Sequence, residues 1–374
     1  MKSADNLALF GAGIAKICAH TPLAKDKPLR WSIIANPKAG GFTITSRWKK
    51  HAADLDAAVE KAGLHPLHKD AAPSGVGCAD VAGLSLTGKA GDARQFAEAV
   101  IAAMARDDAF HLIITAGGDG TSLEVLTAFF YAGESLRKRC AVLRLPMGTG
   151  NDGSDAWELG KALDLIVSPS KVTFTPAVRL ACAGADKGPF LAFNILSVGL
   201  DAFVTHNTNK MKGALPGDSY KLWVDIASLL YDRIYTVGHM DITLFDEAGA
   251  EIRSLSGKPL LLAVGASGRR TYGSRKRILP DDRNVCIVWQ MPAYRKLLLK
   301  NTFTTGTHID KPEVALFAAS RVEFQGEHPI LAQMDGETVS LAKEDFPCGI
   351  ALTEPVIPVL QPAPVERKGG RFSA

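Results

Sequence analysis

The stretch HLIITAGGDGTSLEVLTAFFYAG, residues 111–133, places an apolar run, a glycine-rich turn and a helix-like segment in direct succession. The turn is Gly117-Gly118-Asp119-Gly120-Thr121. Its glycines let the backbone approach a phosphate closely and aim several N–H groups at it. A strand, a glycine turn and a helix in this order place an anion at the N-terminus of the helix. The stretch therefore predicts a phosphate site at the end of a strand in an α/β sheet.

Two further turns follow apolar runs. The run AVLRL, residues 141–145, leads into a second turn with the sequence PMGTGND, and WSIIA, residues 31–35, leads into NPKAGG. Neither a P-loop signature nor a dinucleotide-binding G-x-G-x-x-G after the first strand is present, which argues against both of those nucleotide sites. The candidate phosphate-site and cofactor-site residues of these two turns are Gly148, Thr149, Asn151 and Asp152 in the second and Asn36, Lys38 and Gly40 in the third.

Acidic side chains beside the first turn indicate a cation. Asp119 would repel a phosphate held by the same turn unless a cation such as Mg²⁺ intervened. Glu124, one turn into the expected helix, lies on the same side as Gly120 and Thr121 and is a further candidate for contact with the cofactor. An exposed helix residue without such a role remains the alternative for Glu124.

Strand and helix alternate through the first half of the chain. The sequence predicts a strand at 31–35, a helix at 44–62 ending at Gly63, and a helix that begins with Asp92 as its N-cap and carries an apolar stripe at i, i+3, i+4 spacing. From about residue 29 to 171 the pattern is β-α-β-α-β, which is typical of a parallel sheet with helices on its faces. Ligands collect beyond the carboxyl ends of such strands, where all three turns fall.

The second half has a different texture. Short alternating runs at 179–183, 190–197, 240–245, 260–265, 285–290, 314–317 and 322–325 predict mostly antiparallel β structure, with a hairpin turn at 246–249 and one helix at 219–235. The proline-rich end predicts a surface segment that runs into a disordered tail. The expected divisions are an extension at 1–28, an α/β domain at 29–175, a β-sandwich domain at 176–360 and the tail at 361–374.

Composition and charge limit the function classes. A chain of 374 residues favours two domains, and a net charge of +4 is too small to imply a nucleic-acid partner. No run reaches the 18 to 20 apolar residues, roughly, that span a bilayer, and the six scattered cysteines indicate reduced thiols, not disulfides or a zinc site. Nine Lys or Arg against two Asp between 265 and 300 favour an anionic partner, with a solvated face as the alternative.

The order of the motifs resembles the diacylglycerol kinase catalytic domain family. After the turns at 36–40, 117–121 and 146–152 come Phe193-Asn194, a Gly-Leu-Asp-Ala run at 199–202, Gly-Thr-His at 306–308 and Asp335-Gly336-Glu337, in the usual order of that family. NAD kinases and phosphofructokinases share the Gly-Gly-Asp-Gly turn, whereas the later motifs point to the lipid kinase branch, which also includes sphingosine and ceramide kinases. The resemblance implies a nucleotide-binding α/β domain, a β-sandwich domain, ATP and Mg²⁺ in the cleft, and a lipid hydroxyl as acceptor.

The resemblance also assigns roles. It gives the nucleotide phosphates to the turns at 117–121 and 148–152 and the part of catalytic base to Asp335. In an extended segment, Asp335 and Glu337 would project to the same side, so that one takes the proton and the other orients it. Two positions depart from the family pattern: Gly-Ser-Asp-Ala at 153–156 stands where a bulky residue, Ala and Arg often follow, and Arg283 replaces a glycine beside Asp281 and Asp282, where a structural Mg²⁺ is sometimes bound.

The function expected from the sequence is an ATP-dependent lipid kinase of the cytoplasm that contacts membranes peripherally and phosphorylates diacylglycerol. The basic residues between Arg269 and Arg277 are the candidate membrane contact. A kinase for a sphingoid base or another acceptor, and a regulator that binds ATP or lipid without catalysis, are the alternatives. Asp119 and Asp282 are the candidate metal ligands, and the oligomeric state stays open, a homodimer included.

Overall fold

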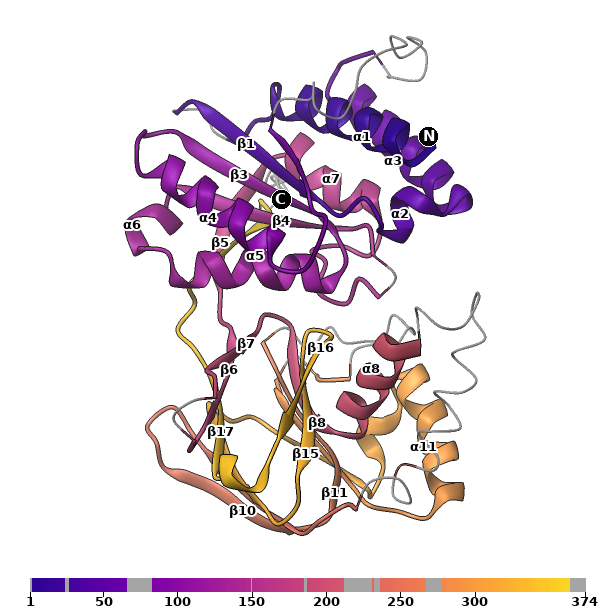
Figure 1. Ribbon diagram of the computed structural model, residues 1–374, viewed down its shortest axis with the longest axis vertical. Coiled ribbons are helices and arrows are strands. Elements are labelled where there is room, and N and C mark those ends of the chain that lie inside the picture. Colours follow the sequence, from indigo (N-terminus) through magenta and orange to yellow (C-terminus); the bar gives the residue numbers. More distant parts are fainter. Residues whose placement is uncertain are drawn as a thin grey trace, which may run out of the picture.

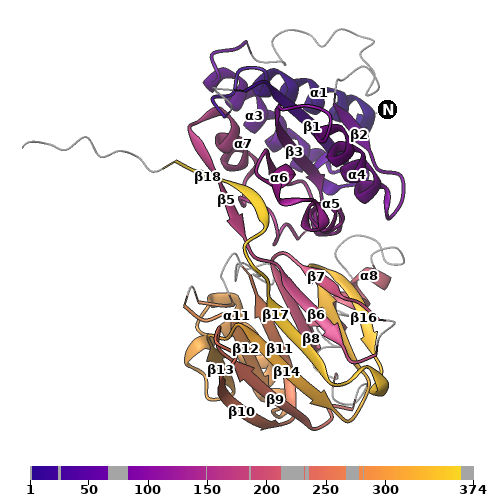
Figure 2. The ribbon, with the colours of Figure 1, turned by 90° about the vertical axis from the view of Figure 1, so that its left-hand side faces the viewer.

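The computed structural model describes residues 2–23, 27–65, 83–148, 150–184, 187–211, 231, 236–266, 278–280 and 282–363. Two domains lie one above the other in Figure 1, and the chain passes between them twice, at 176–177 and at 353–356. Figure 2 shows the two connections side by side at the narrow waist of the molecule. Among the described residues, no helix is long and apolar enough to cross a membrane.

The first domain is built on a six-stranded sheet in the order β2-β1-β3-β4-β18-β5. Strands β1 to β4 and β18 are parallel, and β5 runs antiparallel to β18. Buried strands of this kind read as continuous apolar runs, as the sequence of β3 and β4 does. The strands of this sheet are β1 (Leu29–Ala35), β2 (Leu84–Leu86), β3 (Phe110–Gly117), β4 (Cys140–Pro146), β5 (Ser170–Thr175) and β18 (Ile357–Pro362).

Helices cover both faces of this sheet. One face packs against α1, α3 and α7 through side chains such as Phe10, Leu55 and Leu163, and the other packs against α4 and α5 through Ala97 and Phe129. The predicted parallel α/β architecture is confirmed, and the helix predicted at 44–62 is α3. The helices of the domain are α1 (Lys2–Cys18), α2 (Gly40–Thr43), α3 (Thr45–Lys61), α4 (Asp92–Met104), α5 (Asp119–Tyr131), α6 (Glu134–Arg137) and α7 (Leu159–Val167).

The second domain is a sandwich of two antiparallel sheets, as predicted. The sheets have the orders β10-β9-β14-β17-β6-β7 and β13-β12-β11-β8-β15-β16, and their inner faces share one core. Its strands are β6 (Val178–Cys182), β7 (Phe190–Ala192), β8 (Ile195–Gly199), β9 (Met240–Phe245), β10 (Glu251–Gly257), β11 (Pro259–Gly265), β12 (Val285–Trp289), β13 (Val314–Phe317), β14 (Arg321–Gly326), β15 (Ile330–Met334), β16 (Glu337–Leu341) and β17 (Cys348–Leu352).

Helices α8 (Leu200–Met211) and α11 (Ala293–Thr305) cover the outer face of the second of these sheets, and two short 3₁₀ turns, η2 (His308–Asp310) and η3 (Lys343–Asp345), complete the domain. Sequence analysis did not predict α8 or α11, whose polar and β-branched residues give a weak helical pattern. The helix predicted at 219–235 lies, apart from Tyr231, outside the described residues. The hairpin predicted at 246–249 is confirmed as the turn between β9 and β10.

The C-terminal strand corrects the prediction of a surface segment. Strand β18 lies inside the sheet of the first domain, where Ile357 and Val359 are 1% and 4% exposed. Prolines hid this strand, because a proline cannot donate to a ladder and is rare in central strands. The sheet accommodates them because β18 pairs with β4 at a single position, Val359 opposite Val142. The first domain therefore includes residues that the sequence division assigns to the sandwich.

Candidate functional site

The three glycine turns meet at the carboxyl edge of the parallel strands. Asn36 follows β1, and its N–H donates to the carbonyl of Ala116 on β3 at 3.0 Å. The N–H of Gly41 donates to the carbonyl of Met147 at 2.9 Å and so ties the turn after β1 to the turn after β4. The prediction that the turns lie together at one edge of the sheet is confirmed.

Backbone packing between two of the turns requires glycine. A Cβ on Gly148 would lie 2.6 Å from the Cα of Gly118 and 3.2 Å from the carbonyl oxygen of Gly117. A Cβ on Gly117 would lie 2.4 Å from Oγ1 of Thr121. These separations are shorter than non-bonded atoms tolerate. A side chain at Gly148 would therefore force the two turns apart, and one at Gly117 would displace the side chain of Thr121 within its own turn.

Asp119 joins the turn after β3 to the loop after β4. Its Oδ1 accepts the N–H of Gly153 at 3.0 Å. A Cβ on Gly150 would lie 2.9 Å from Oδ2 of the same carboxylate. The first residue of α5 therefore fixes the position of the loop that carries Asp152.

The two asparagines of the turns shape their own backbone. Asn151 has a left-handed φ of 60°, and its side-chain amide donates to the carbonyls of Pro146 and Gly148 at 3.2 and 3.1 Å. The Oδ1 of Asn36 accepts the N–H of Lys38 at 2.9 Å. The Asn36 contact is an Asx turn, whereas Asn151 holds its turn through carbonyls that precede it in the chain. Thr149 lies outside the described residues.

Arg47 is a neighbour of these turns that sequence analysis missed. Its Nη1 donates to the carbonyl of Gly148 at 3.3 Å, and a Cβ on Gly40 would lie 2.9 Å from the same nitrogen. The side chain of α3 therefore places a guanidinium beside the turns that contain Gly40 and Gly148. Arg47 could not be identified from the sequence, because it is one of many charged residues in α3.

Glu124 has a different partner from the one predicted. Its Oε1 accepts the N–H of Gly91 at 2.8 Å, and its Oε2 accepts the N–H groups of Ala93 and Arg94 at 3.1 and 3.3 Å. The carboxylate thus caps the N-terminus of α4, where N–H groups lack helical partners and a negative charge is favourable. Asp92, predicted as the N-cap, is the first helical residue, and Gly91 is the N-cap.

Glu124→Gln is expected to destabilise the first domain without changing nucleotide affinity. The amide keeps the size of the side chain but gives up the charge-assisted hydrogen bonds, for a loss of about 1–3 kcal/mol in the free energy of unfolding. Urea unfolding and calorimetric titration with MgATP measure the two quantities. Glu134→Gln on the exposed α6 is the matched control. A large loss of nucleotide affinity in Glu124→Gln alone would indicate that Glu124 contacts the cofactor after all.

Asp335 lies in a tight turn of the second domain. Asp335 and Gly336 have φ values of 45° and 100° and connect β15 to β16, a two-residue hairpin of the kind that Asp-Gly favours. The expectation of an extended segment is therefore wrong, because the pair turns the chain. The carboxylate of Asp335 accepts the N–H groups of three consecutive residues, Phe193, Asn194 and Ile195, the last at 2.9 Å.

A network of polar side chains stabilises the turn at Asp335 and Gly336. The N–H of Gly336 donates to Oε1 of Gln333 at 2.9 Å, and the amide of Gln333 donates to Ser197 and Asp201 at 2.9 and 3.2 Å. On the other side, Nδ2 of Asn209 on α8 donates to the carbonyl of Gly336 at 2.9 Å. The Gly-Leu-Asp-Ala run that begins α8 is thereby connected to the turn at 335–336.

The two domains meet at this turn. A Cβ on Gly120, in the first domain, would lie 3.1 Å from Oε1 of Glu337, in the second. The glycine turn after β3 therefore faces the start of β16 directly. The tertiary structure brings together motifs that are about 200 residues apart in the chain.

Burial raises the pKa of Asp335 above that of an ordinary aspartate, while the backbone N–H groups of Phe193, Ile195 and Asn194 and the charge of Arg144 lower it. The net direction is upward. A carboxylate with a raised pKa is a stronger proton acceptor when ionised, as a general base requires.

Two family models match the chain in succession. The diacylglycerol kinase catalytic domain matches residues 30–174, and the YegS C-terminal NAD kinase beta sandwich-like domain matches residues 194–350. The first domain of the chain is thus similar to the diacylglycerol kinase catalytic domain, and the second is similar to the YegS C-terminal domain. The two matches follow the two domains of the structure, one on the α/β sheet and the other on the sandwich.

Curated relatives and a solved structure resemble the chain over most of its length. The "Probable lipid kinase YegS-like" of Cronobacter sakazakii is 26% identical over 239 residues, 63% of this chain and 74% of that protein. A protein of the same name from Xanthomonas axonopodis pv. citri is 27% identical over 260 residues, 67% and 79% of the two chains. A crystal structure from Bacillus anthracis str. Sterne has the same fold, with a TM-score of 0.56 and 19% identity over 90% of this chain and 97% of that chain.

One buried ion pair departs from the family pattern noted in the sequence. Arg144 on β4 donates from Nε and Nη2 to Oδ1 of Asp155, at 3.1 and 2.6 Å, and Asp155 stands in the stretch where the family often has Ala and Arg. A signal for this pair existed in the sequence: Arg144 interrupts the apolar run AVLRL, which is otherwise a buried strand.

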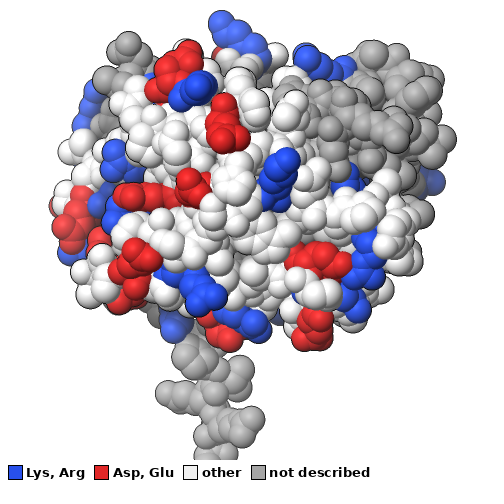
Figure 3. Space-filling model, turned by 90° about the horizontal axis from the view of Figure 1, so that it is seen from below, with Lys and Arg blue, Asp and Glu red and all other residues white. Residues whose placement is uncertain are grey.

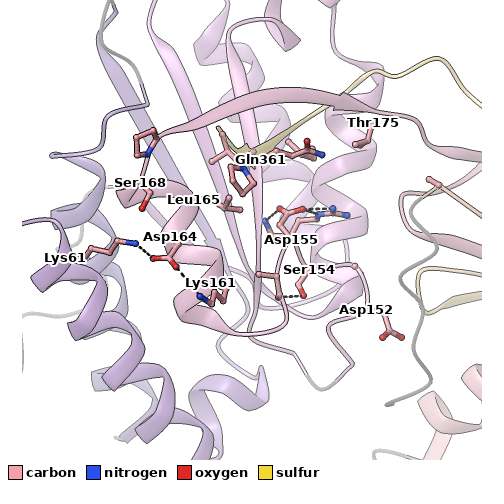
Figure 4. A pocket seen from close by; sticks show the side chains of 18 residues that line it. Lys61, Asp152, Ser154, Asp155, Lys161, Asp164, Leu165, Ser168, Thr175 and Gln361 are labelled. Atoms are coloured by element: carbon pink, nitrogen blue, oxygen red, sulfur yellow. Dashed lines mark hydrogen bonds and ion pairs between the residues drawn. The ribbon is translucent and has the colours of Figure 1, made fainter. Parts of the chain in front are cut away.

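A cavity of about 750 Å³ opens beside this ion pair. Figure 4 shows Asp155 on one side of it, Lys161 and Asp164 of α7 on the other, and Thr175 and Gln361 above. The cavity is lined by the loop 152–156, α7, β5, β18 and Ala266 of the second domain. Lysines at its rim are paired, because Lys61 lies 2.6 Å from Asp164.

The candidate metal ligand Asp282 does not fit a metal site. Its side chain is 77% exposed, and its Oδ1 lies 3.5 Å from Nε of the neighbouring Arg283, a cation that competes with a metal. Asp281 lies outside the described residues. Within the described ranges, no group of three or more His, Cys, Asp or Glu is arranged to hold a metal ion. Asp119 remains compatible with Mg²⁺, because Mg²⁺ often uses one or two carboxylates together with substrate phosphates.

Proposed function

We propose that the protein is an ATP-dependent lipid kinase that transfers the γ-phosphoryl group of ATP to the hydroxyl of a lipid, with diacylglycerol as the acceptor. The observation that carries the proposal is the junction of Gly120 and Glu337, where the glycine turns of the first domain face the Asp335 turn of the second. Phosphoryl transfer needs little beyond an aligned nucleophile, neutralised phosphate charge and an acceptor for the hydroxyl proton. At this junction, the glycine turns would bind the phosphates, and the Asp335 turn would accept the proton of the aligned hydroxyl.

The turns of the first domain are proposed to bind the nucleotide. Backbone N–H groups at the N-terminus of α5 and in the turn after β4 are suited to phosphate oxygens, since the helix dipole favours an anion there. Lys38 and Arg47 add positive charge beside these turns. Mg²⁺, when bound, would neutralise charge on the phosphates, and Asp119 is the residue proposed to hold it.

Asp335 is proposed to act as the general base. Its carboxylate takes the proton of the acceptor hydroxyl, and Glu337, two residues further on and directed at Gly120, orients the acceptor beside the nucleotide turn. Since the pKa of Asp335 is raised, the ionised form is lost at a higher pH than for an ordinary aspartate. Turnover is therefore expected to fall as the pH drops through that raised pKa.

Transfer of labelled phosphate from ATP to a panel of lipid alcohols tests the proposal and its alternatives. Phosphorylation of diacylglycerol supports it. If a sphingoid base or a soluble acceptor is labelled in place of diacylglycerol, the proposed acceptor would be wrong, while the proposed kinase activity would stand. If the protein binds ATP but transfers phosphate to no acceptor, the proposal of an enzyme would be wrong and a regulator would be supported. The departure from the family pattern at residues 153–156 is the reason to consider a regulator.

A lipid kinase must reach its substrate at a membrane surface. The basic residues between Arg269 and Arg277 are the proposed contact, and they lie outside the described residues. The end of the second domain seen in Figure 3 intermingles Lys and Arg with Asp and Glu, so it shows no gathering of basic side chains in the part that is described.

Arg275→Gln together with Arg277→Gln is expected to weaken binding to vesicles that contain anionic lipid. Each basic residue near such a surface contributes about 1 kcal/mol, so two lost charges predict a decrease of roughly thirtyfold in affinity. Vesicle sedimentation at low and physiological salt measures it, because screening weakens the same attraction. Arg253→Gln with Lys258→Gln changes the net charge equally at exposed positions and is the control. Equal binding by both double variants, or binding unaffected by salt, would refute this docking segment.

A further inference from the structure

Two cysteines of the second domain face each other across neighbouring strands. Cys182 is the last residue of β6, Cys348 is the first residue of β17, and the antiparallel ladder pairs them directly. Both side chains lie on the inner face of their sheet, where Cys348 belongs to the core of the sandwich and Cys182 packs against it. Both thiols are free, so the structure describes the reduced form of the pair.

The hydrogen bonds of this ladder show which type of pair the two cysteines form. Next to them, the N–H of Ala183 donates to the carbonyl of Pro347 at 3.0 Å. At the other end of the ladder, the N–H of Thr353 donates to the carbonyl of Ala177 at 2.9 Å. Hydrogen-bonded and non-hydrogen-bonded pairs alternate along an antiparallel ladder, and both of these bonds lie an odd number of positions from the cysteines. The cysteines are therefore a non-hydrogen-bonded pair, the type in which opposing Cα atoms are about 4.5 Å apart.

A separation of this size permits a disulfide. Cysteines that are joined by a disulfide have Cα atoms roughly 4.4 to 6.8 Å apart, so the backbone of the ladder needs no large movement to allow the bond. The two thiols also form a hydrogen bond with each other. By contrast, Cys286, another buried cysteine of this domain, has Ala263 and Leu316 as its partners in the ladders on either side.

We propose that Cys182 and Cys348 form a reversible disulfide when the protein meets a low-molecular-weight disulfide as oxidant. Cys182 is partly exposed, whereas Cys348 is 1% exposed, so the oxidant reaches Cys182 first. The thiolate of Cys182 attacks one sulfur of the oxidant, forms a mixed disulfide and releases one small thiol. The thiolate of Cys348 then attacks the sulfur of Cys182, which completes the internal disulfide and releases the second small thiol. The two electrons and two protons that the oxidant gains come from the two cysteines.

The bond would join the first and the last strand of the sandwich. Strand β6 follows the connection between the domains at 176–177, and β17 precedes the connection at 353–356 (Figure 2). The loop that the disulfide closes, residues 183–347, therefore contains all the other strands of the second domain. Closing a long loop removes conformational freedom chiefly from the unfolded chain, so the oxidised domain should resist unfolding more than the reduced domain.

Burial raises the pKa of both thiols, so little thiolate is present at neutral pH. Because the thiolate is the species that attacks a disulfide, the exchange should be slow near neutral pH and faster as the pH rises. The reduced form is therefore expected to persist until the protein is exposed to the oxidant for a long time.

The test treats the full-length protein with oxidised glutathione at about pH 8.5, near the ordinary pKa of a thiol. The protein is then alkylated without reduction, digested and analysed by mass spectrometry. The expected result is a pair of peptides that is linked through Cys182 and Cys348 and is released by dithiothreitol. Thermal unfolding of the oxidised protein should show the transition of the second domain raised by roughly 5 to 15 °C, and dithiothreitol should reverse this shift.

Cys182→Ser and Cys348→Ala should each abolish the linked peptides and the thermal shift, whereas Cys286→Ala, at a buried position of the same domain, should keep both. Glutathione attached to Cys182 without the internal link, a bond between two copies of the chain, or thiols that stay free would each overturn the proposal. Linked peptides without any rise in the unfolding temperature would refute the stabilising effect. Peptide mapping of the wild type decides whether the bond forms even if a variant does not fold. Since no readout uses turnover, the result is independent of the proposed kinase activity.

Discussion

Asp335→Asn is expected to reduce lipid phosphorylation by about 10²- to 10⁴-fold while MgATP still binds. The amide cannot accept the proton of the acceptor hydroxyl. One of its two polar atoms is also a donor, which would oppose the N–H groups of Phe193, Asn194 and Ile195 that now meet two carboxylate oxygens. The proposed nucleotide turns belong to the other domain, so their affinity should change little.

Initial rates with saturating MgATP, together with calorimetric titration of MgATP, measure the two effects. Asp310→Asn, at an exposed position of the same domain, makes the same chemical change away from the site and serves as the control. Retention of more than about one tenth of the wild-type rate in Asp335→Asn would remove Asp335 from the role of base.

Gly148→Ala is expected to have the second large effect. The new Cβ would lie 2.6 Å from a backbone atom, the Cα of Gly118, so no side-chain rotation can relieve the contact. Overpacking of this kind costs about 1–3 kcal/mol. Because the two turns that must separate are the proposed phosphate site, much of this cost should appear as a loss of MgATP affinity of roughly five- to hundredfold.

Gly349→Ala is the matched control for that substitution. A Cβ on Gly349 meets nothing within 4 Å, and this glycine lies in β17 of the second domain. Calorimetric titration and thermal unfolding of both variants separate affinity from stability. MgATP affinity that is equal in Gly148→Ala, Gly349→Ala and the wild type would show that the turn after β4 does not contribute to the nucleotide site.

Local patterns predicted the first domain well, because its elements are coded by contiguous residues. Apolar runs before glycines gave β1, β3 and β4, and helical spacing gave α3 and α4. The parallel order then followed from the alternation of strand and helix, which places all three turns at one edge. Strand β18 escaped this logic, because its prolines argue against a strand and its partners lie more than 180 residues earlier in the chain.

Some site residues could likewise be predicted from the sequence, and others could not. The glycines at 117, 118 and 148 were predictable, since few residues besides glycine permit such close backbone contact. The partner of Glu124 was not predictable. A carboxylate one turn into a helix can reach either a ligand or the end of a neighbouring helix, and the sequence does not show where the N-terminus of α4 lies in the fold. Arg144 was visible as a charge in an apolar strand, but its partner Asp155 could be recognised only after folding.

By itself, the sequence determined the two-domain order, the glycine turns and the motif Asp335-Gly336-Glu337, since each depends on residues adjacent in the chain. Only the tertiary structure decided what those residues face. Asp335 meets three N–H groups about 140 residues away, and Glu337 meets Gly120 of the other domain. Burial and electrostatic interaction depend on distance in space, and no local pattern encodes which distant side chains the fold will bring within that distance.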